Sequence, residues 1–345
     1  MQNKTILITG IAGFIGFHAA RRFLAEGYRV VGLDEVNDYY DPTLKEARLA
    51  ELDPSRYTFY RVSLEDTAAV NQIFKTEQID LVLHLAAQAG VRYSIDRPDV
   101  YITSNIVGFL SILEACRHYP VEQLMYASSS SVYGSNTKMP FAVTDAVDHP
   151  LSLYAASKKA NELMAHTYSS LYGVKTTGLR FFSVYGPWGR PDMALFKFTE
   201  AIANGQPIDL YNYGEMGRDF TYVDDIIESI YRLMLTEPVA DPAFNQEDPL
   251  PDRSNVPYRV FNIGSHSPIR LNEFVTLIEQ RLGKKAIKHE MPLQAGDVPE
   301  SFADVTSLFE TIGYRPQTTI EDGVHAFIDW YERHYQLKEE VQDGA

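Results

Sequence analysis

Short runs of apolar and β-branched residues recur along the first half of the chain, and amphipathic stretches separate them. Each run is too short for a buried helix and indicates a buried strand. The expected strands are Thr5 to Thr9, Arg29 to Leu33, Thr58 to Val62, Asp80 to Leu85, Gln123 to Ala127 and Lys175 to Phe181. The helical patterns between them include Phe14 to Glu26, Asp66 to Thr76, Val100 to His118 and Tyr154 to Leu171.

This alternation predicts the fold class. Strands joined by crossover helices run parallel, and helices then cover both faces of the sheet. After about Tyr185 the rhythm loosens, with helical patterns at Asp224 to Leu235, Asn272 to Leu282 and Ile320 to His334. We predict an α/β protein with a Rossmann-type doubly wound parallel sheet and a smaller C-terminal α/β lobe. The expected division is 1–185 and 186–345, with some later segments returning to the first domain.

Composition and charge narrow the classes of partner. The 345 residues include 31 Lys plus Arg against 46 Asp plus Glu, a net charge of -15. Such a charge repels nucleic-acid phosphates and anionic membrane surfaces, so we expect neither partner. Cys116 is the only cysteine, so no intramolecular disulfide forms, which fits a reducing compartment.

The N-terminus superficially resembles a secretory signal, because Lys4 precedes the uncharged run Thr5 to Ala20. Gly10, Gly13 and Gly16 break that run, whereas an export segment is continuously apolar. No uncharged apolar run of about 20 residues, the length that spans a bilayer, is present. We therefore expect a soluble, cytoplasmic protein.

The three glycines follow the first strand directly and open the first helix. Small residues there let the backbone approach a pyrophosphate at the positive end of the helix. Their spacing is GxxGxxG rather than GxGxxG, and by itself it also fits a plain tight turn. Asp34 ends the second strand near the offset expected for an acid that binds the adenosine ribose. Because its carboxylate would repel a 2′-phosphate, we predict NAD rather than NADP.

A serine run, a tyrosine and a lysine are the candidate catalytic residues. Tyr154 and Lys158 stand at i and i+4 of a predicted helix, so their side chains share one face. A neighbouring ammonium and the positive nicotinamide both favour the phenolate, which predicts a lowered Tyr154 pKa and a general base. Ser128 to Ser131 end a strand at the edge where doubly wound sheets bind ligands.

These residues resemble the extended short-chain dehydrogenase/reductases, specifically the nucleotide-sugar 4-epimerases, over nearly the whole chain. The matching motifs are TGIAGFIG at Thr9 to Gly16, LHLAAQAGVRYS at Leu83 to Ser94, ASSSSVYG at Ala127 to Gly134, YAASK at Tyr154 to Lys158 and RDFTYVDD at Arg218 to Asp225. The resemblance implies that Ser129 assists Tyr154 and Lys158, with Ser130 beside the sugar. It also implies further cofactor contacts from Phe14, Ile15, Ser63, Leu64, Leu85, Ala86 and Ala87, although many relatives have an aspartate at the position of Ser63.

A second set of motifs resembles UDP-glucuronate 4-epimerases in particular. They are GPWGRPDMA at Gly186 to Ala194, NDYYDP at Asn37 to Pro42 and QAGVRYS at Gln88 to Ser94. By this resemblance Arg190 meets the sugar carboxylate, which a guanidinium binds in bidentate fashion, and Ser183 and Arg92 lie near the sugar. Arg190 also fits an exposed turn residue before Pro191.

The resemblance extends to the nucleotide end of the substrate. It places Arg218 at the diphosphate and Asp297 near the uridine ribose. Relatives that act on glucose and galactose often have arginine where Gln294 stands, so the diphosphate charge would rest more heavily on Arg218.

The implied reaction interconverts UDP-glucuronate and UDP-galacturonate by transient oxidation at C4′, with tightly bound NAD. UDP-glucuronate decarboxylation and neutral-sugar epimerisation remain alternatives. Dehydration is disfavoured because Ser130 and Ser131 occupy the positions of the dehydratase Asp-Glu pair. A non-catalytic NAD-sensing regulator is the alternative of another class, and such proteins typically lack the tyrosine and lysine.

The sequence also bears on metal binding and on assembly. The nine histidines form no ligand cluster, so we expect no metal, and His84 fits a core histidine better than a ligand. Family members often dimerise through two helices per subunit, and Val100 to His118 with Tyr154 to Leu171 are the candidates for a homodimer.

Overall fold

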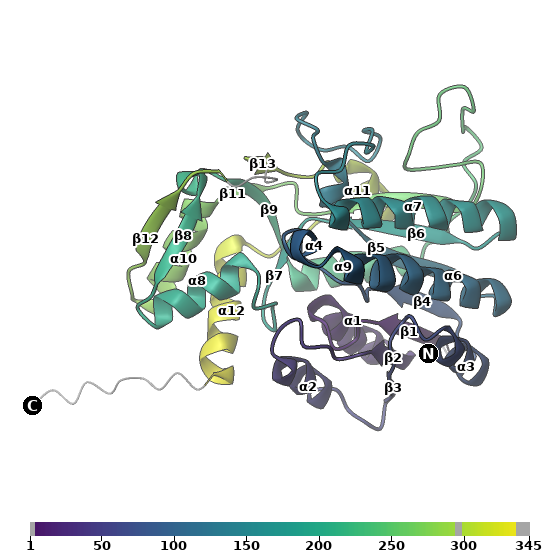
Figure 1. Cartoon of the computed structure of the whole chain (residues 1–345), viewed down its shortest axis with the longest axis horizontal. Coiled ribbons are helices and arrows are strands. Elements are labelled where there is room, and N and C mark those ends of the chain that lie inside the picture. The colour runs from purple at the N-terminus through teal and green to yellow at the C-terminus, as the bar shows by residue number, and fades with distance from the viewer. Residues whose placement is uncertain (1–3, 294–298, 336–345) are drawn as a thin grey trace, which may run out of the picture.

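The computed structural model describes residues 4–293 and 299–335, and its main element is a seven-stranded parallel sheet (Figure 1). The strand order is β10-β6-β5-β4-β1-β2-β3. Its strands are β1 Thr5–Thr9, β2 Arg29–Asp34, β3 Tyr57–Arg61, β4 Leu81–His84, β5 Gln123–Ser129, β6 Thr176–Phe181 and β10 Tyr258–Ile263. The order reverses next to β1, as in a doubly wound sheet, which confirms the predicted Rossmann-type class.

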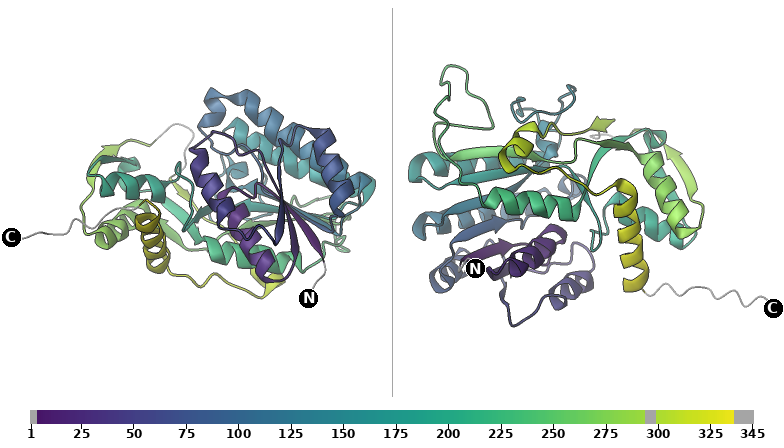
Figure 2. Two further views of the ribbon diagram at one scale, coloured as in Figure 1. Left: turned by 90° about the horizontal axis from the view of Figure 1, so that it is seen from below. Right: turned by 180° about the vertical axis from the view of Figure 1, so that it is seen from behind.

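Helices cover both faces of this sheet, as the two further views in Figure 2 show. One face carries α1 Phe14–Ala25, α9 Val223–Met234 and α11 Thr306–Ile312, and the other carries α3 Thr67–Glu77, α6 Gly108–His118 and α7 Leu153–Tyr172. Strand alternation divides the apolar side chains between the two layers. In β1, Ile6 and Ile8 enter the core beneath α1, whereas Leu7 enters the core beneath α3 and α6.

Helix starts and ends follow local sequence signals. Ser152 caps α7 by accepting a hydrogen bond from the Ala155 N–H, and Gly173 ends that helix in a left-handed conformation. Asp41 caps α2 Pro42–Ala50, with proline as its first residue. The other helical segments of this domain are α4 Tyr93–Asp96, α5 Pro98–Tyr101, the π-helix η1 Ile102–Val107 and the 3-10 helix η2 Ser130–Tyr133.

The smaller lobe lies beside the carboxyl ends of the strands and has its own apolar core (Figure 1). Its helices are α8 Ala194–Ala203, α10 Leu271–Leu282, α12 Ile320–His334 and the short η3 Asn212–Gly214. Its strands are β7 Ser183–Tyr185, β8 Pro207–Tyr211, β9 Gly217–Tyr222, β11 Pro268–Arg270, β12 Ile287–Met291 and β13 Glu300–Ser301. Later segments also return to the larger layer, where β10 pairs with β6 and α9 packs on α1.

One helical stretch within the described residues, Pro98–His118, is long and apolar enough to cross a membrane by length and composition. It contains Asp99 and Glu114, so it is not an uncharged apolar run. Half of its most apolar window is buried inside the protein, where α6 packs between α3 and α7. The core helix of a soluble protein meets the same criteria, so the stretch is weak support for a membrane span.

Candidate active site

The glycine turn after β1 is packed against backbone too closely to accept a side chain at Gly10 or Gly16. Gly10 has a φ of +72°, and a Cβ on Gly16 would lie 2.0 Å from the Gly10 carbonyl oxygen. Gly13 precedes α1 in extended conformation, so the unpaired N–H groups of the first helical turn border the cavity beyond the turn. This arrangement fits the pyrophosphate of a dinucleotide.

Asp34 is the last residue of β2 and joins that strand to the glycine turn. Its Oδ2 accepts the Ala12 N–H at 3.0 Å and its Oδ1 accepts the Val36 N–H at 2.8 Å. Burial raises the pKa of Asp34, and these two N–H groups with Lys45 oppose the rise. Each carboxylate oxygen has a further lone pair that can accept a ribose hydroxyl, so the residue fits its predicted role.

Ser129, Tyr154 and Lys158 converge where β5 ends and α7 begins. Ser129 ends β5, and its Oγ donates to the Ser131 Oγ at 3.1 Å and accepts the Ser131 N–H at 3.2 Å. Lys158 is 3% exposed, and its Nζ donates to the Ala127 carbonyl of β5 at 3.0 Å. The lysine therefore fixes the first turns of α7 against the strand that carries the serines.

The expected lowering of the Tyr154 pKa is wrong for the groups that the chain itself supplies. Burial raises the pKa of Tyr154, and the hydrogen bond between Tyr154 and Ser129 and the charge of Arg190 only partly oppose it. Burial also lowers the pKa of Lys158 to about 8. Helical spacing gives the direction of both side chains but not the loss of solvent around them, so the sequence omits the larger effect. The positive charge of the nicotinamide is the other contribution on which the prediction depended.

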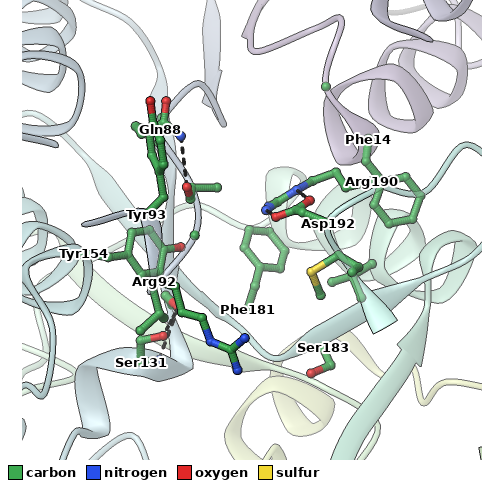
Figure 3. A pocket seen from close by; sticks show the side chains of 18 of the residues that line it. Phe14, Gln88, Arg92, Tyr93, Ser131, Tyr154, Phe181, Ser183, Arg190 and Asp192 are labelled. Atoms are coloured by element: carbon green, nitrogen blue, oxygen red, sulfur yellow. Dashed lines mark hydrogen bonds and ion pairs between the residues drawn. The ribbon is translucent and has the colours of Figure 1, made fainter. Parts of the chain in front are cut away.

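Arg190 lines the same cavity, and Asp192 forms an ion pair with Arg190 (Figure 3). The Nε of Arg190 donates to Asp192 Oδ1 at 2.9 Å, and its Nη2 donates to Oδ2 at 2.5 Å. Arg92 extends from the opposite wall, with its guanidinium carbon 5.2 Å from the centre of the Tyr211 ring. Arg190 is thus a cavity residue with a carboxylate partner, not an exposed turn residue.

All but one of the predicted site residues line a single cavity of about 1060 Å³. They are Gly10, Gly13, Phe14, Ile15, Gly16, Asp34, Ser63, Leu64, Leu85, Ala86, Ala87, Arg92, Ser129, Ser130, Tyr154, Lys158, Ser183, Arg190 and Arg218. The Nη1 of Arg218 donates to the carbonyls of Gly217 and Pro299, at 3.0 and 3.3 Å. Asp297, like Gln294, lies outside the described residues. The volume lies at the upper end of ordinary ligand pockets, consistent with room for more than one small ligand.

Sequence reasoning missed the residues that hold this cavity in shape. Arg48 is fully buried on α2, and its guanidinium donates to the carbonyls of Ala12, Trp188 and Gly189. One side chain therefore joins the glycine turn to the loop that carries Arg190. Tyr39 and Asp192 were also missed, although each lies within a motif used for the resemblance.

Two negative expectations concern metals and histidine. No group of three or more His, Cys, Asp or Glu that could hold a metal occurs among residues 4–293 and 299–335. The ring of His84 shares a hydrogen bond with the Thr9 hydroxyl at 2.8 Å and stacks on Phe109. Its interpretation as a satisfied core histidine is confirmed.

The parallel sheet, the glycine turn and the Ser-Tyr-Lys group together define the extended short-chain dehydrogenase/reductase class of enzymes. Residues 6–264 match the NAD dependent epimerase/dehydratase family, and the chain belongs to that family. The family's NAD dependence confirms the predicted cofactor, and its chemistry confirms that the protein is an enzyme.

Individual relatives are similar over most of their length. Protein CapI of Staphylococcus aureus is 58% identical over 96% of this chain and 99% of its own. A probable UDP-glucuronate 4-epimerase of Rhizobium meliloti is 48% identical over 96% of this chain and 97% of its own. The solved structure of a Bacillus cereus UDP-glucuronic acid 4-epimerase with UDP-glucuronic acid and NAD is similar to this chain, with a TM-score of 0.83 and 30% identity. It covers 96% of this chain and 100% of its own.

Proposed function

We propose that the protein is a UDP-glucuronate 4-epimerase, which interconverts UDP-glucuronate and UDP-galacturonate. The observation that carries the proposal is that the guanidinium of Arg190 borders the same cavity as Tyr154 and Ser129. A neutral sugar needs no fixed cation at that place, whereas a uronate carboxylate pairs with a planar guanidinium. The relatives named as UDP-glucuronate 4-epimerases support the same substrate.

The cofactor is held by residues of the larger domain. The turn of Gly10, Gly13 and Gly16 would cradle the pyrophosphate, and Asp34 would accept the adenosine ribose hydroxyls. Phe14, Ile15, Ser63, Leu64, Leu85, Ala86 and Ala87 would form the walls around the two nucleosides. Bound NAD supplies the hydride acceptor for C4′ and returns the hydride, so the chemistry is redox-neutral over one turnover.

Tyr154 is the proton carrier in this proposal. Its phenol oxygen takes the proton of the 4′-hydroxyl during oxidation and returns it during reduction. Ser129, which hydrogen-bonds Tyr154, and Ser130 hold the reacting oxygen. Lys158 fixes the start of α7 through Ala127, and the positive charge of a bound nicotinamide, added to that of Lys158, would favour the phenolate of Tyr154.

Inversion requires the 4-keto sugar to present its other face before hydride and proton return. Arg218 would hold the diphosphate while the sugar turns about its bond to that group. Ser183 and Arg92 border the cavity on the sugar side and would steady both orientations. Asp297 remains the proposed contact of the uridine ribose.

The experiment is to incubate the purified protein with UDP-glucuronate and to identify the product by NMR. We expect UDP-galacturonate, whereas UDP-xylose would support the decarboxylase and unreacted substrate would refute both. UDP-glucose is tested in parallel, because its conversion would indicate a neutral-sugar epimerase. The Tyr154→Phe variant is the control, because it keeps the ring and removes the proton carrier. It should lower the rate by about 10²-fold or more.

We also propose a homodimer and a cytoplasmic location. Apolar side chains are exposed on the two candidate helical stretches, at Ile102, Val107 and Leu110 on one and at Leu163 and Leu171 on α7. Burying such side chains against a second copy is favourable. Light scattering at micromolar concentration should give twice the chain mass, and a monomer would refute the assembly.

Cell fractionation tests the proposed cytoplasmic location.

The division into a cofactor domain over 1–185 and a mainly substrate-binding lobe over 186–345 also remains a proposal. It is supported by the apolar core that α8, β8, α10 and α12 share. The segments α9, β10 and α11 return to the larger layer, whereas β7 already pairs with β9 of the smaller lobe.

A further inference from the structure

The carboxylate of Asp192 accepts two hydrogen bonds from one edge of the Arg190 guanidinium. The two residues flank Pro191, and their side chains are 25% and 26% exposed. Burial opposes ionisation of Asp192, but the charge and hydrogen bonds of Arg190, together with the Asp192 N–H and the Tyr39 hydroxyl, outweigh it and keep the pKa of Asp192 below its ordinary value. The pair is therefore charged at neutral pH, and its bidentate geometry fixes the plane of the guanidinium.

Asp192 is itself held from a second side. The hydroxyl of Tyr39, from the loop after β2, donates to Asp192 Oδ2 at 3.3 Å. Burial and the charge of Asp192 raise the pKa of Tyr39 to about 12, so the phenol keeps its proton and remains a donor. Tyr39 fits there because residue 90 is glycine: a Cβ on Gly90 would lie 2.5 Å from the Tyr39 hydroxyl.

This arrangement leaves a defined part of Arg190 for a ligand. A guanidinium has five N–H donors in one plane, and the Nε and Nη2 edge is occupied by Asp192. Among residues 4–293 and 299–335, Nη1 of Arg190 donates no hydrogen bond. A sugar carboxylate that enters the cavity can therefore meet the Nη1 end of the fork, in an orientation that Asp192 has already set.

We infer that Asp192 is a positioning residue, which fixes Arg190 to restrain the sugar carboxylate and whose negative charge weakens uronate binding. The inference rests on the proposed function. Restraint matters because the 4-keto uronate is a β-keto acid. When its carboxylate bond aligns with the carbonyl π system, CO₂ leaves, the bonding electron pair stays on C5, and C5 takes a proton from solvent. A carboxylate held by a fixed guanidinium keeps out of that alignment.

The test replaces Asp192 by Asn, which keeps the shape and removes the charge and one acceptor. Affinity for UDP-glucuronate should rise about fivefold, since a repulsive charge is gone, while kcat falls about tenfold because Arg190 loses its fixed plane. Released CO₂ relative to epimer should rise about tenfold. Affinity for UDP, which has no sugar, should not change. Asp209→Asn is the matched control: it removes a carboxylate from another wall of the cavity and should leave the product ratio unchanged.

Tyr39→Phe provides a milder variant, because it removes only the hydrogen bond to Asp192. It should move the CO₂ ratio in the same direction by a smaller factor. A wild-type kcat and CO₂ ratio in Asp192→Asn would overturn the inference. Equal weakening of UDP and UDP-glucuronate binding would also overturn it, because Asp192 would then serve only to fold its loop. Failure of the wild-type protein to convert UDP-glucuronate would instead refute the proposed function, and is measured separately.

Discussion

At the scale of single residues, the side chain with the most specific proposed task is Arg190. It is the cation beside Tyr154, and its charge lowers the pKa that burial of Tyr154 raises. Sequence motifs indicate Arg190 because a guanidinium between Gly189 and Pro191 is a local pattern. Its pairing with Asp192 depends on the path of a loop, which no local pattern specifies, and the same holds for burial around Tyr154.

Replacing Arg190 by Ala should remove both binding energy and restraint. We expect epimerisation of UDP-glucuronate to fall about a hundredfold, with CO₂ and a pentose product appearing, because the charge-assisted contact to the carboxylate is lost. Radiolabel at C6 measures the CO₂. Arg190→Lys keeps the charge without the planar fork and should give an intermediate rate. Unaltered kinetics in Arg190→Ala would exclude this residue as the carboxylate site.

At the scale of elements, a buried ion pair beneath the candidate active site fixes α7 to the sheet. Glu162 lies one turn after Lys158, and its two oxygens accept from Arg180 Nε and Nη2 of β6 at 2.8 and 2.9 Å. Ser128 of β5 donates to the same carboxylate at 2.7 Å. The network thus ties the helix that carries Tyr154 to the strand that carries Ser129.

Glu162→Gln should leave the fully buried Arg180 charge without its partner. We expect a loss of about 3–5 kcal/mol in the free energy of unfolding, measured by denaturant titration. Glu237→Gln, which breaks an exposed pair with Lys175, should leave the midpoint unchanged. Similar midpoints for the two variants would show that the buried network does not fix α7.

Elements that bury an apolar face in the sheet layers could be predicted from the sequence to within a residue or two. The expected Tyr154 to Leu171 is α7 Leu153–Tyr172, and Thr5 to Thr9 is β1 as found. The short helix α2 was missed although Asp41 and Pro42 mark its start, because its apolar pattern is weak. Strand β8 was missed because it pairs only with β12, far along the chain.

At the scale of the whole molecule, one buried histidine makes stability depend on pH. Burial and the nearby Lys158 lower the pKa of His84 to about 3, so the folded protein keeps the ring neutral. The unfolded chain takes up a proton near pH 6.5. Stability from this group is therefore complete above that pH and is lost as the pH falls, by about 1.4 kcal/mol per pH unit.

His84→Asn removes the titrating ring and keeps a polar group beside Thr9. Between pH 6.5 and 4 the unfolding free energy should fall less steeply with pH in the variant than in the wild type. The difference between the two slopes should correspond to about one proton taken up on unfolding. The slope is the readout, because the absolute stability also changes with packing. Equal slopes would mean that His84 titrates normally in the folded protein.

The position of β10 has a consequence for how the chain is made. This strand closes one edge of the larger sheet beside β6, yet it begins at Tyr258, after much of the smaller lobe has been synthesised. A nascent chain that ends near residue 185 has every other strand of that sheet and an open edge at β6, which is prone to pair with foreign strands. The larger sheet therefore cannot be completed until translation has passed residue 263, so its open edge lasts while the first part of the smaller lobe is synthesised.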